Sequence, residues 1–299
     1  MNQLSRQTKT ILVTGSNGQL GRELLEISGR FPKLNFLFTD VAELDITKQA
    51  EIKKFLAENP VDLLINCAAY TAVDKAESEA EAAHLLNTVA PGLLAAEAAS
   101  QGFAMIHIST DYVFSGQSYK PYTEADDPDP VSGYGKSKLG GEQAVLNSGA
   151  NAMVIRTSWL YSAFGHNFLK TILRFGKEKP ELKVVFDQIG TPTYAGDLAK
   201  CILDIISSHS IPKASVYHYS NEGVCSWYDF ARAIAEYESL PCKIMPIRTS
   251  EYPTPAPRPA YSVLDKCKIK NDFGIEIPWW KDSIHHCLER LHAKNNVSS

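Results

Sequence analysis

The sequence predicts an α/β fold in which a parallel sheet is covered by helices on both faces. Over the first half of the chain, short apolar runs alternate with helical patterns of roughly 10–20 residues. Such alternation gives right-handed crossovers, which place consecutive strands parallel. A turn with three glycines directly follows the first apolar run. After about residue 160 the alternation stops, so we expect a smaller C-terminal α/β domain there.

Each expected element follows from its apolar pattern and from the residues that stop it. The first helix ends at Gly29, since glycine commonly stops a helix. The second ends at Asn59-Pro60, because proline does not continue a helix. The proline-rich segment 241–261 excludes helix and central strand, so we expect an ordered loop across a cleft. The expected strands are 11–14, 34–39, 61–66, 103–109 and 152–156, and the expected helices are 20–28, 47–58, 78–100 and 132–146.

Composition excludes several classes of protein. The chain has 299 residues, of which 44% are hydrophobic, and this supports a folded core rather than a disordered or fibrous chain. The formal net charge of −4 gives no general attraction to nucleic acid or acidic membranes. The start is polar, and no apolar run approaches the ~18 residues of a membrane span. Six separated cysteines without a Cys-x-x-Cys pair predict reduced thiols of a cytoplasmic protein and no metal site.

The turn after the first strand has the spacing of a dinucleotide phosphate loop. Gly15 allows the tight turn, Gly18 allows the backbone to approach a pyrophosphate, and Gly21 lets the helix lie against the strand. Strand, turn and helix together predict a Rossmann-type doubly wound sheet. We expect an NAD(P)-binding domain over 1–160, joined by return segments from later chain, and a mainly substrate-binding domain over 161–299 with a soft boundary. The loop residues expected at the cofactor are Gly15, Asn17, Gly18, Gln19, Leu20 and Gly21.

Asp40 closes the second expected strand, where a carboxylate would accept hydrogen bonds from the adenosine ribose hydroxyls. A carboxylate there favours NADH by repelling a 2′-phosphate. Arg22, just after the glycines, could offset that repulsion. The choice between NADPH and NADH therefore stays open at this point.

A set of polar residues predicts proton-transfer chemistry at the sheet edge. Thr110 ends the strand 103–109, and Tyr134 and Lys138 lie four apart, on one face of the following helix. A phenol with a pKa of about 10 is a poor acid at neutral pH unless its phenolate is stabilised. We expect the Lys138 ammonium to lower the Tyr134 pKa, and Thr110 to hold the reacting oxygen.

These residues carry a resemblance to a known family. The chain resembles the extended short-chain dehydrogenase/reductases, and within them a subfamily that acts on dTDP-linked 4-keto-6-deoxy sugars. The motifs that carry it are Thr14-Gly15-x-x-Gly18-x-x-Gly21, Asn66-Cys67-Ala68-Ala69-Tyr70, Thr110-Asp111-Tyr112-Val113-Phe114-Ser115-Gly116, Tyr134-Gly135-Lys136-Ser137-Lys138, Arg156-Thr157-Ser158-Trp159-Leu160-Tyr161, Asp187-Gln188-Ile189-Gly190-Thr191-Pro192-Thr193 and Arg258-Pro259 with Ser262, Leu264 and Asp265. The likeness runs from about Thr10 to Leu291.

The resemblance implies reduction of dTDP-6-deoxy-L-lyxo-4-hexulose to dTDP-L-rhamnose with NADPH or NADH. Tyr134 would protonate the C4 oxygen, Lys138 would hold the nicotinamide ribose, and Thr110 would fix the carbonyl. By the same likeness, Asp45 and Ile46 would contact adenine, and Ala68, Ala69 and Tyr70 would line the cofactor groove. Asp111, Tyr112 and Trp159 would line the sugar pocket, and Arg258 would lie near the nucleotide diphosphate.

Some family members carry Mg²⁺ between subunits on glutamates, and Glu23 matches one such position. A glutamate at a helix start is more often a partner of the helix dipole, and the sequence assigns no other metal ligand. A homodimer is possible, whereas nucleic acid and membrane are not expected partners.

Two alternatives stay open. The first is a nucleotide-sugar epimerase or dehydratase on the same scaffold, which would keep its NAD bound. The second is a non-catalytic regulatory subunit resembling the β subunit of methionine adenosyltransferase.

Overall fold

The central feature of the structure, a computed structural model that describes residues 8–297, is a parallel sheet. Within these residues the main sheet has six strands in the order β10-β5-β4-β3-β1-β2, with parallel pairing throughout. The strands of the chain are β1 (Lys9–Thr14), β2 (Leu34–Thr39), β3 (Leu63–Asn66), β4 (Ala104–Thr110), β5 (Ala152–Thr157), β6 (Leu160–Tyr161), β7 (Glu181–Val185), β8 (Ile189–Gly190), β9 (Thr193–Tyr194), β10 (Ser215–His218), β11 (Cys225–Ser226) and β12 (Lys243–Ile247).

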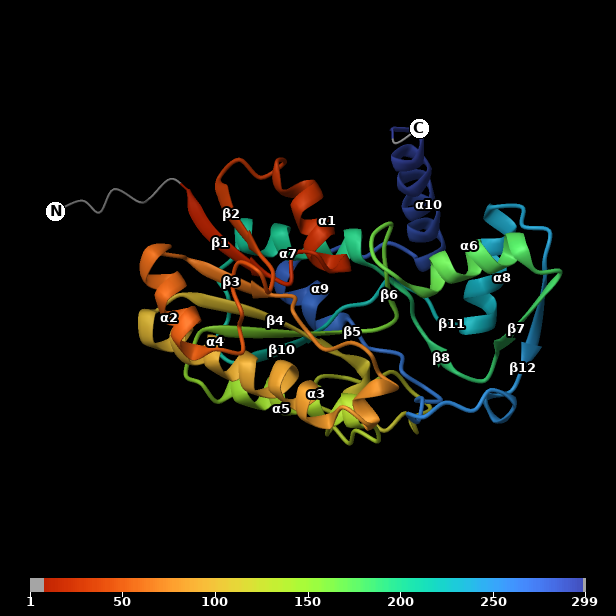
Figure 1. The fold of residues 1–299 in the computed structure, drawn as a ribbon, viewed down its shortest axis with the longest axis horizontal. Helices are drawn as coiled ribbons and strands as arrows, with labels where there is room; N and C mark the ends of the chain where they lie inside the picture. Colours follow the sequence, from red (N-terminus) through yellow and green to blue (C-terminus); the bar gives the residue numbers. More distant parts are fainter. Residues whose placement is uncertain (1–7, 298–299) are drawn as a thin grey trace.

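Helices cover both faces of this sheet. In Figure 1, α1, α7 and α9 lie above the sheet, and α2, α4 and α5 lie below it. The strands carry continuous apolar runs because both of their faces are buried. The helices are α1 (Gln19–Ser28), α2 (Gln49–Glu58), α3 (Ala80–His84), α4 (Ala90–Gln101), α5 (Gly133–Leu146), α6 (Phe168–Glu178), α7 (Ala195–Ser208), α8 (Trp227–Tyr237), α9 (Cys267–Phe273) and α10 (Trp280–Val297).

The order in which strands are added to the sheet reverses at β1: β2 lies on one side of it and β3 on the other. From β1 the sheet grows to β2 on one side and through β3, β4 and β5 on the other, so the loops after β1 and β3 diverge. Gly15, which follows β1, has φ +67°, and a Cβ there would lie 2.6 Å from the backbone nitrogen of Ala68. This close approach brings the two loops together at the edge where open α/β sheets bind ligands.

The expected helix 78–100 is interrupted, which corrects the prediction. A π-helical segment, Leu85–Val89, separates α3 from α4. Pro91 lacks an N–H, so the carbonyl of Asn87 loses its usual partner four residues on, and the helix widens there. The Asn87 side chain donates to the Tyr70 carbonyl and to the Ser137 hydroxyl, both at 3.0 Å. The interruption therefore ties α5 to the loop after β3.

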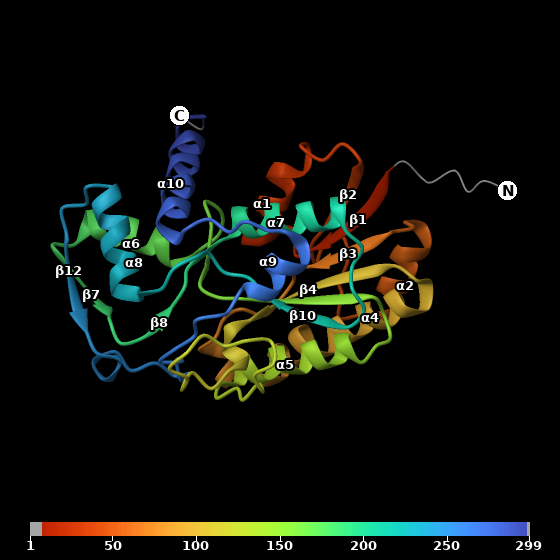
Figure 2. The same ribbon diagram turned by 180° about the vertical axis from the view of Figure 1, so that it is seen from behind.

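The second half of the chain builds a smaller body beside the sheet. Within the described residues it contains three two-stranded sheets, β6-β9, β7-β12 and β8-β11. Figure 2 shows β7, β8 and β12 together with α6, α8 and α10, on the side of the molecule away from the N-terminus. The proline-rich segment 241–261 is not entirely loop, because β12 pairs with β7 and includes Pro246. A strand in a two-stranded pair has one unpaired edge, so a residue without an N–H is tolerated.

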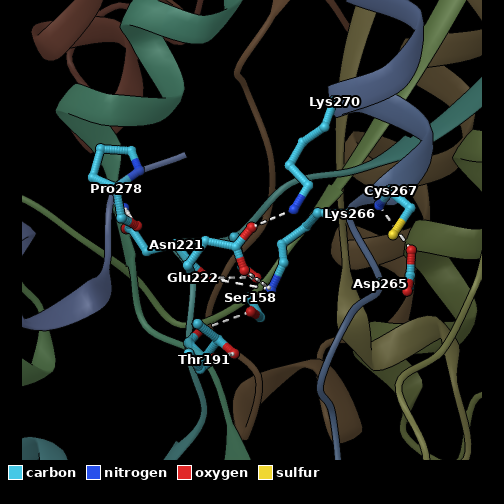
Figure 3. A network of polar contacts seen from close by, with 11 residues as sticks. Ser158, Thr191, Asn221, Glu222, Asp265, Lys266, Cys267, Lys270 and Pro278 are labelled. Atoms are coloured by element: carbon cyan, nitrogen blue, oxygen red, sulfur yellow. Dashed lines mark hydrogen bonds and ion pairs between the residues drawn. The ribbon is translucent and has the colours of Figure 1, made fainter. Parts of the chain in front are cut away.

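Polar contacts join this smaller body to the sheet, as Figure 3 shows around Asn221 and Glu222. The Asn221 side chain accepts from the Tyr194 amide at 2.7 Å and donates to Asp197 at 2.7 Å. Glu222 forms ion pairs with Lys266 at 3.5 Å and Lys270 at 2.8 Å. Tyr194 is in β9 of the smaller body, whereas Asn221 and Glu222 follow β10 of the main sheet, so the Asn221 contact joins the two bodies.

The packing of α5 gives the first testable prediction. A Cβ on Gly141 would lie 2.0 Å from the Asn87 carbonyl oxygen, so Gly141→Ala must push α5 from the π-helical segment. We expect a loss of about 1–3 kcal/mol in unfolding free energy, the usual cost of overpacking. Gly29→Ala is the control, since a Cβ at Gly29 meets nothing within 4 Å. Urea unfolding checks both, and equal midpoints for the two variants would contradict the packing argument.

Candidate active site

A cavity of about 970 Å³ lies at the carboxyl edge of the sheet, between the sheet and the smaller body. Its size is at the upper end of the range of about 300–1,000 Å³ for small-molecule sites. Most of the expected site residues line it together: Gly15, Gly18, Gln19, Leu20, Gly21, Asp40, Asp45, Ile46, Ala68, Ala69, Thr110, Asp111, Tyr112, Tyr134, Lys138 and Trp159.

The phosphate loop is held in place by Asp40. One carboxylate oxygen of Asp40 accepts from the Asn17 amide at 2.9 Å, and the other accepts from the Val41 amide at 2.8 Å. A Cβ on Gly21 would lie 2.5 Å from the Gly15 carbonyl oxygen, so only glycine lets α1 begin this close to the turn. The amides at the start of α1 are thereby free to face an anion in the cavity.

Thr110, Tyr134 and Lys138 all line this cavity. Thr110 ends β4, while α5 begins at Gly133 under a cap in which the Ser132 hydroxyl accepts from the Gly135 amide at 3.1 Å. A Cβ on Gly135 would lie 2.2 Å from the Tyr112 carbonyl oxygen. The glycine therefore allows the start of α5, and with it Tyr134, to approach the end of β4.

The structure corrects the expected electrostatics of Tyr134. Burial raises the pKa of Tyr134 well above its ordinary value, and a hydrogen bond with Thr110 lowers it by less. The Lys138 ammonium instead donates to the Ile108 carbonyl at 2.7 Å. Burial lowers the pKa of Lys138 to about 8. At neutral pH the phenol therefore keeps its proton and the lysine is mostly charged.

Two further polar groups line the cavity beside Tyr134. Burial raises the pKa of Asp111 to about 6, and hydrogen bonds from Ser262 and Thr110 oppose the increase. Burial also raises the pKa of Tyr112 to about 12. The Tyr112 and Tyr134 rings meet edge to face, with centroids 5.5 Å apart. This end of the cavity thus presents hydroxyl and carboxyl groups to a polar ligand.

A pair of stacked tryptophans forms the opposite wall. The rings of Trp159 and Trp227 lie 3.7 Å apart at 11°. Trp159 has φ +48°, and a Cβ on Gly190 would lie 2.7 Å from its ring, so the glycine makes room for the indole. Trp227 starts α8, which Ser226 and Asp229 cap reciprocally.

Sequence reasoning missed several residues that line the cavity. A Ser-x-x-Asp capping pattern could have located the start of α8, although not the direction in which Trp227 points. Ser109 adjoins Thr110, and Thr157 and Ser158 directly precede Trp159, whereas Gly165 and His166 carry no local signal that places them here. The missed residues include Ser109, Thr157, Ser158, Gly165, His166 and Trp227.

Three expected site residues are not among the described residues that line the cavity: Asn17, Tyr70 and Arg258. The Tyr70 hydroxyl donates to Glu79 at 2.6 Å. The Arg258 guanidinium donates to Asp74 at 2.8 Å, and its Nη1 has no hydrogen-bond partner within residues 8–297.

The residues around Glu23 do not fit Mg²⁺. The Glu23 side chain is fully buried, with one oxygen accepting from the Ser162 hydroxyl at 2.6 Å and the other from the Arg290 guanidinium. The Arg290 guanidinium also donates to the Tyr194 hydroxyl. A fixed cation of the chain thus occupies the place of a metal. No cluster of three metal-ligating side chains occurs in the part of the chain that the structure describes.

A glycine-rich loop at a helix start, with a hydroxyl, a tyrosine and a lysine at the same sheet edge, defines an NAD(P)-dependent oxidoreductase of the extended short-chain dehydrogenase/reductase type. Residues 9–293 match the RmlD substrate-binding domain family, and the chain belongs to this family. The dTDP-4-dehydrorhamnose reductase of Burkholderia thailandensis is 41% identical over 94% of this chain and 98% of its own length.

Solved structures agree with this assignment. A dTDP-4-dehydrorhamnose reductase of Clostridium acetobutylicum has a TM-score of 0.89 and 41% identity, covering 95% of this chain and 99% of its own. That of Bacillus anthracis, solved with NADP, has a TM-score of 0.91 and 36% identity over 95% and 99%. These relatives favour a reductase over both alternatives raised by the sequence. No helix among residues 8–297 is long and apolar enough to cross a membrane.

The position of Asp40 gives a prediction about cofactor choice. Its carboxylate lines the cavity and would repel a 2′-phosphate, so Asp40→Ser should lower the KM for NADPH more than that for NADH. The expected difference is about 1 kcal/mol, because the site is near solvent and screened. Glu43→Gln removes the same charge from an exposed neighbour outside the cavity and serves as the control. The measurement is steady-state kinetics with both cofactors. Parallel changes in the two KM values would mean that Asp40 does not contact the ribose.

Proposed function

We propose that the protein reduces the 4-keto group of dTDP-6-deoxy-L-lyxo-4-hexulose (dTDP-4-dehydrorhamnose) to give dTDP-L-rhamnose, for cell-surface polysaccharide synthesis. The observation that carries the proposal is the convergence of Thr110, Tyr134 and Lys138 in the same cavity as the phosphate loop. A cytoplasmic location and a homodimer belong to the same proposal and rest on the sequence alone.

The residues at the sheet edge supply the proton of the reaction. The bound cofactor would supply a hydride to C4, and the ketone oxygen then needs one proton to become a hydroxyl. Tyr134 holds that proton at neutral pH, because burial raises its pKa. Thr110, in hydrogen-bond contact with the same phenol, can hold the C4 oxygen beside it.

Lys138 and the phosphate loop would hold the cofactor on the sheet side of the cavity. The Lys138 ammonium is fixed by the Ile108 carbonyl and would take up the nicotinamide ribose hydroxyls. The start of α1 would face the pyrophosphate, and Asp45 and Ile46 would lie at the adenine. Ala68 and Ala69 have small side chains, which leaves room for the dinucleotide along the sheet edge.

The sugar would lie between the polar end of the cavity and the tryptophan wall. Asp111 and Tyr112 can bond its hydroxyls, while Trp159 offers a flat apolar surface. Arg258 would leave Asp74 and bind the nucleotide diphosphate, since a planar guanidinium suits two phosphate oxygens. Tyr70 and Asn17 would not contact the cofactor directly. Their backbone amides donate to Asn87 and Asp40, and these bonds help to fix the two loops that line the cavity.

Tyr134→Phe tests the proton donor. Without the phenol, kcat should fall by roughly 10²–10⁴-fold, the usual contribution of general acid catalysis. Binding of NADPH, followed by fluorescence titration, should be retained because the ring still packs in the same place. Activity within about threefold of the unsubstituted enzyme would remove Tyr134 from the mechanism.

A pair of variants tests recognition of the diphosphate. NAD(P)H oxidation is followed with the dTDP-4-keto sugar, made enzymatically, and with the free keto sugar. Turnover is expected only with the nucleotide sugar, because binding energy away from the reacting carbon positions it. Arg258→Ala should cost about 2–4 kcal/mol in kcat/KM. Asp74→Asn removes the competing carboxylate and should instead lower the KM.

Equal turnover of the free sugar would overturn the nucleotide-sugar assignment. Turnover of neither sugar would bring back the regulatory alternative.

A further inference from the structure

A buried ion pair lies directly beneath the catalytic residues. Arg156 on β5 donates to both carboxylate oxygens of Glu142 on α5, at 3.0 Å and 3.2 Å through Nε and at 2.7 Å through Nη2. The Ser109 hydroxyl donates to the same carboxylate at 2.5 Å. The Glu142 and Arg156 side chains are only 1% and 5% exposed. The carboxylate is therefore fully engaged and shielded from solvent.

The pair is joined to the catalytic set on two sides. Glu142 follows Lys138 by four residues, so both side chains lie on one face of α5. Ser109 immediately precedes Thr110 on β4. A carboxylate in this position touches neither substrate nor cofactor. Its charge still acts on Lys138, because both groups are buried and water does not screen the interaction between them.

The pair is not explained by stability alone. Removing two charges from water costs free energy that their attraction only partly offsets, and well-packed apolar residues of similar volume are often as stabilising. A buried charged pair next to a buried lysine is better understood by its effect on that lysine.

Apart from Glu142 and its partner Arg156, the titratable groups that act on Lys138 are neutral near pH 7. Burial raises the pKa of Cys67 to about 12, and burial lowers the pKa of His107 well below its ordinary value. Tyr134 on the same helix also keeps its proton. Among residues 8–297, Glu142 thus supplies the negative charge that raises the pKa of Lys138, while burial lowers it.

We propose that Glu142 is a positioning residue that keeps the Lys138 ammonium protonated, and that Arg156 sets how much of the Glu142 charge reaches it. The proposal rests on the proposed function for the role of Lys138 at the cofactor. The electrostatic coupling itself is a property of the free protein.

The sign of the effect differs between the two partners. Glu142→Gln removes the negative charge and leaves Arg156 positive, so the pKa of Lys138 falls. Arg156→Gln leaves Glu142 uncompensated, so the pKa of Lys138 rises. The double variant removes both charges, and because Glu142 is on the same helix face as Lys138, the negative charge dominates the pair. We therefore expect the pKa of Lys138 to be lowest in Glu142→Gln and to increase through the double variant and the unsubstituted protein to its highest value in Arg156→Gln.

The experiment is an NMR titration of the free protein labelled with ¹³C at lysine Cε, with the Lys138 signal assigned by Lys138→Arg. We expect Glu142→Gln to lower the pKa of Lys138 by about one unit, since an opposite charge nearby shifts a pKa by about 1–3 units. Asp204→Asn is the matched control, because Asp204 pairs with Lys200 four residues away on the exposed side of α7. It should leave Lys138 unchanged.

The double variant guards against misfolding, because it leaves no buried charge without a partner. An unchanged Lys138 pKa in both Glu142→Gln and the double variant would overturn the proposal. A lower Lys138 pKa in Arg156→Gln would also overturn the proposal, because a merely structural role would shift the Lys138 pKa in the same direction in both single variants.

Cofactor binding then separates this proposal from the proposed function. The pH at which NADPH affinity declines on the alkaline side, measured by fluorescence without sugar, should follow the Lys138 pKa across the four proteins. If the NMR order holds but the affinity profiles coincide, Glu142 controls Lys138 and the assigned role of Lys138 at the cofactor is wrong.

Discussion

The active site depends on how closely α5 packs against its neighbours. The helix carries Tyr134 and Lys138, yet side chains of ordinary size at its glycines would keep it away from the sheet edge. A Cβ on Gly133 would already lie 3.0 Å from the Ala76 carbonyl oxygen, and Gly135 and Gly141 are tighter still. This close backbone contact lets α5 lie near the end of β4, so that Tyr134 meets Thr110 directly. The rest of the site is arranged around this contact.

Burial has opposite chemical consequences for the two key side chains of α5. It disfavours the charged form of each, so it raises the pKa of Tyr134 and lowers that of Lys138. A tyrosine with a raised pKa is a weak acid in the free protein. This suits the proposed function, in which Tyr134 gives up its proton only as negative charge develops on the ketone oxygen. The proposed role of Lys138 at the cofactor instead requires a retained charge, and the Glu142 carboxylate four residues further on raises the pKa of Lys138.

The sequence predicted the parallel sheet well because the evidence for it is local. Apolar runs mark strands that are buried on both faces, and β2 has the predicted bounds 34–39. The convergence of Thr110, Tyr134 and Lys138 in one cavity was also predictable, because parallel strands end at one edge and a four-residue spacing keeps two side chains on one helix face. The inferences that failed were those that depend on contacts between residues far apart in the sequence. The π-helical segment depends on a proline and on its contact with α5, and the raised pKa of Tyr134 depends on burial. Trp227 reaches the cavity only through the packing of the smaller body, which no spacing in the sequence reveals.

The two halves of the chain meet on the phosphate loop itself, which physically links the cofactor end of the cavity to the tryptophan wall. The Gln19 side chain accepts from Asn167 at 2.9 Å and donates to the Leu160 carbonyl at 3.4 Å. Leu160 directly follows Trp159, while Gln19 begins α1, whose first residues line the cavity. One turn further along α1, Arg290 from α10 reaches the buried Glu23. A phosphate loop held from both bodies cannot shift without moving the segment that carries Trp159. The position of the phosphate loop relative to Trp159 is therefore set by contacts between the halves as much as by the sheet.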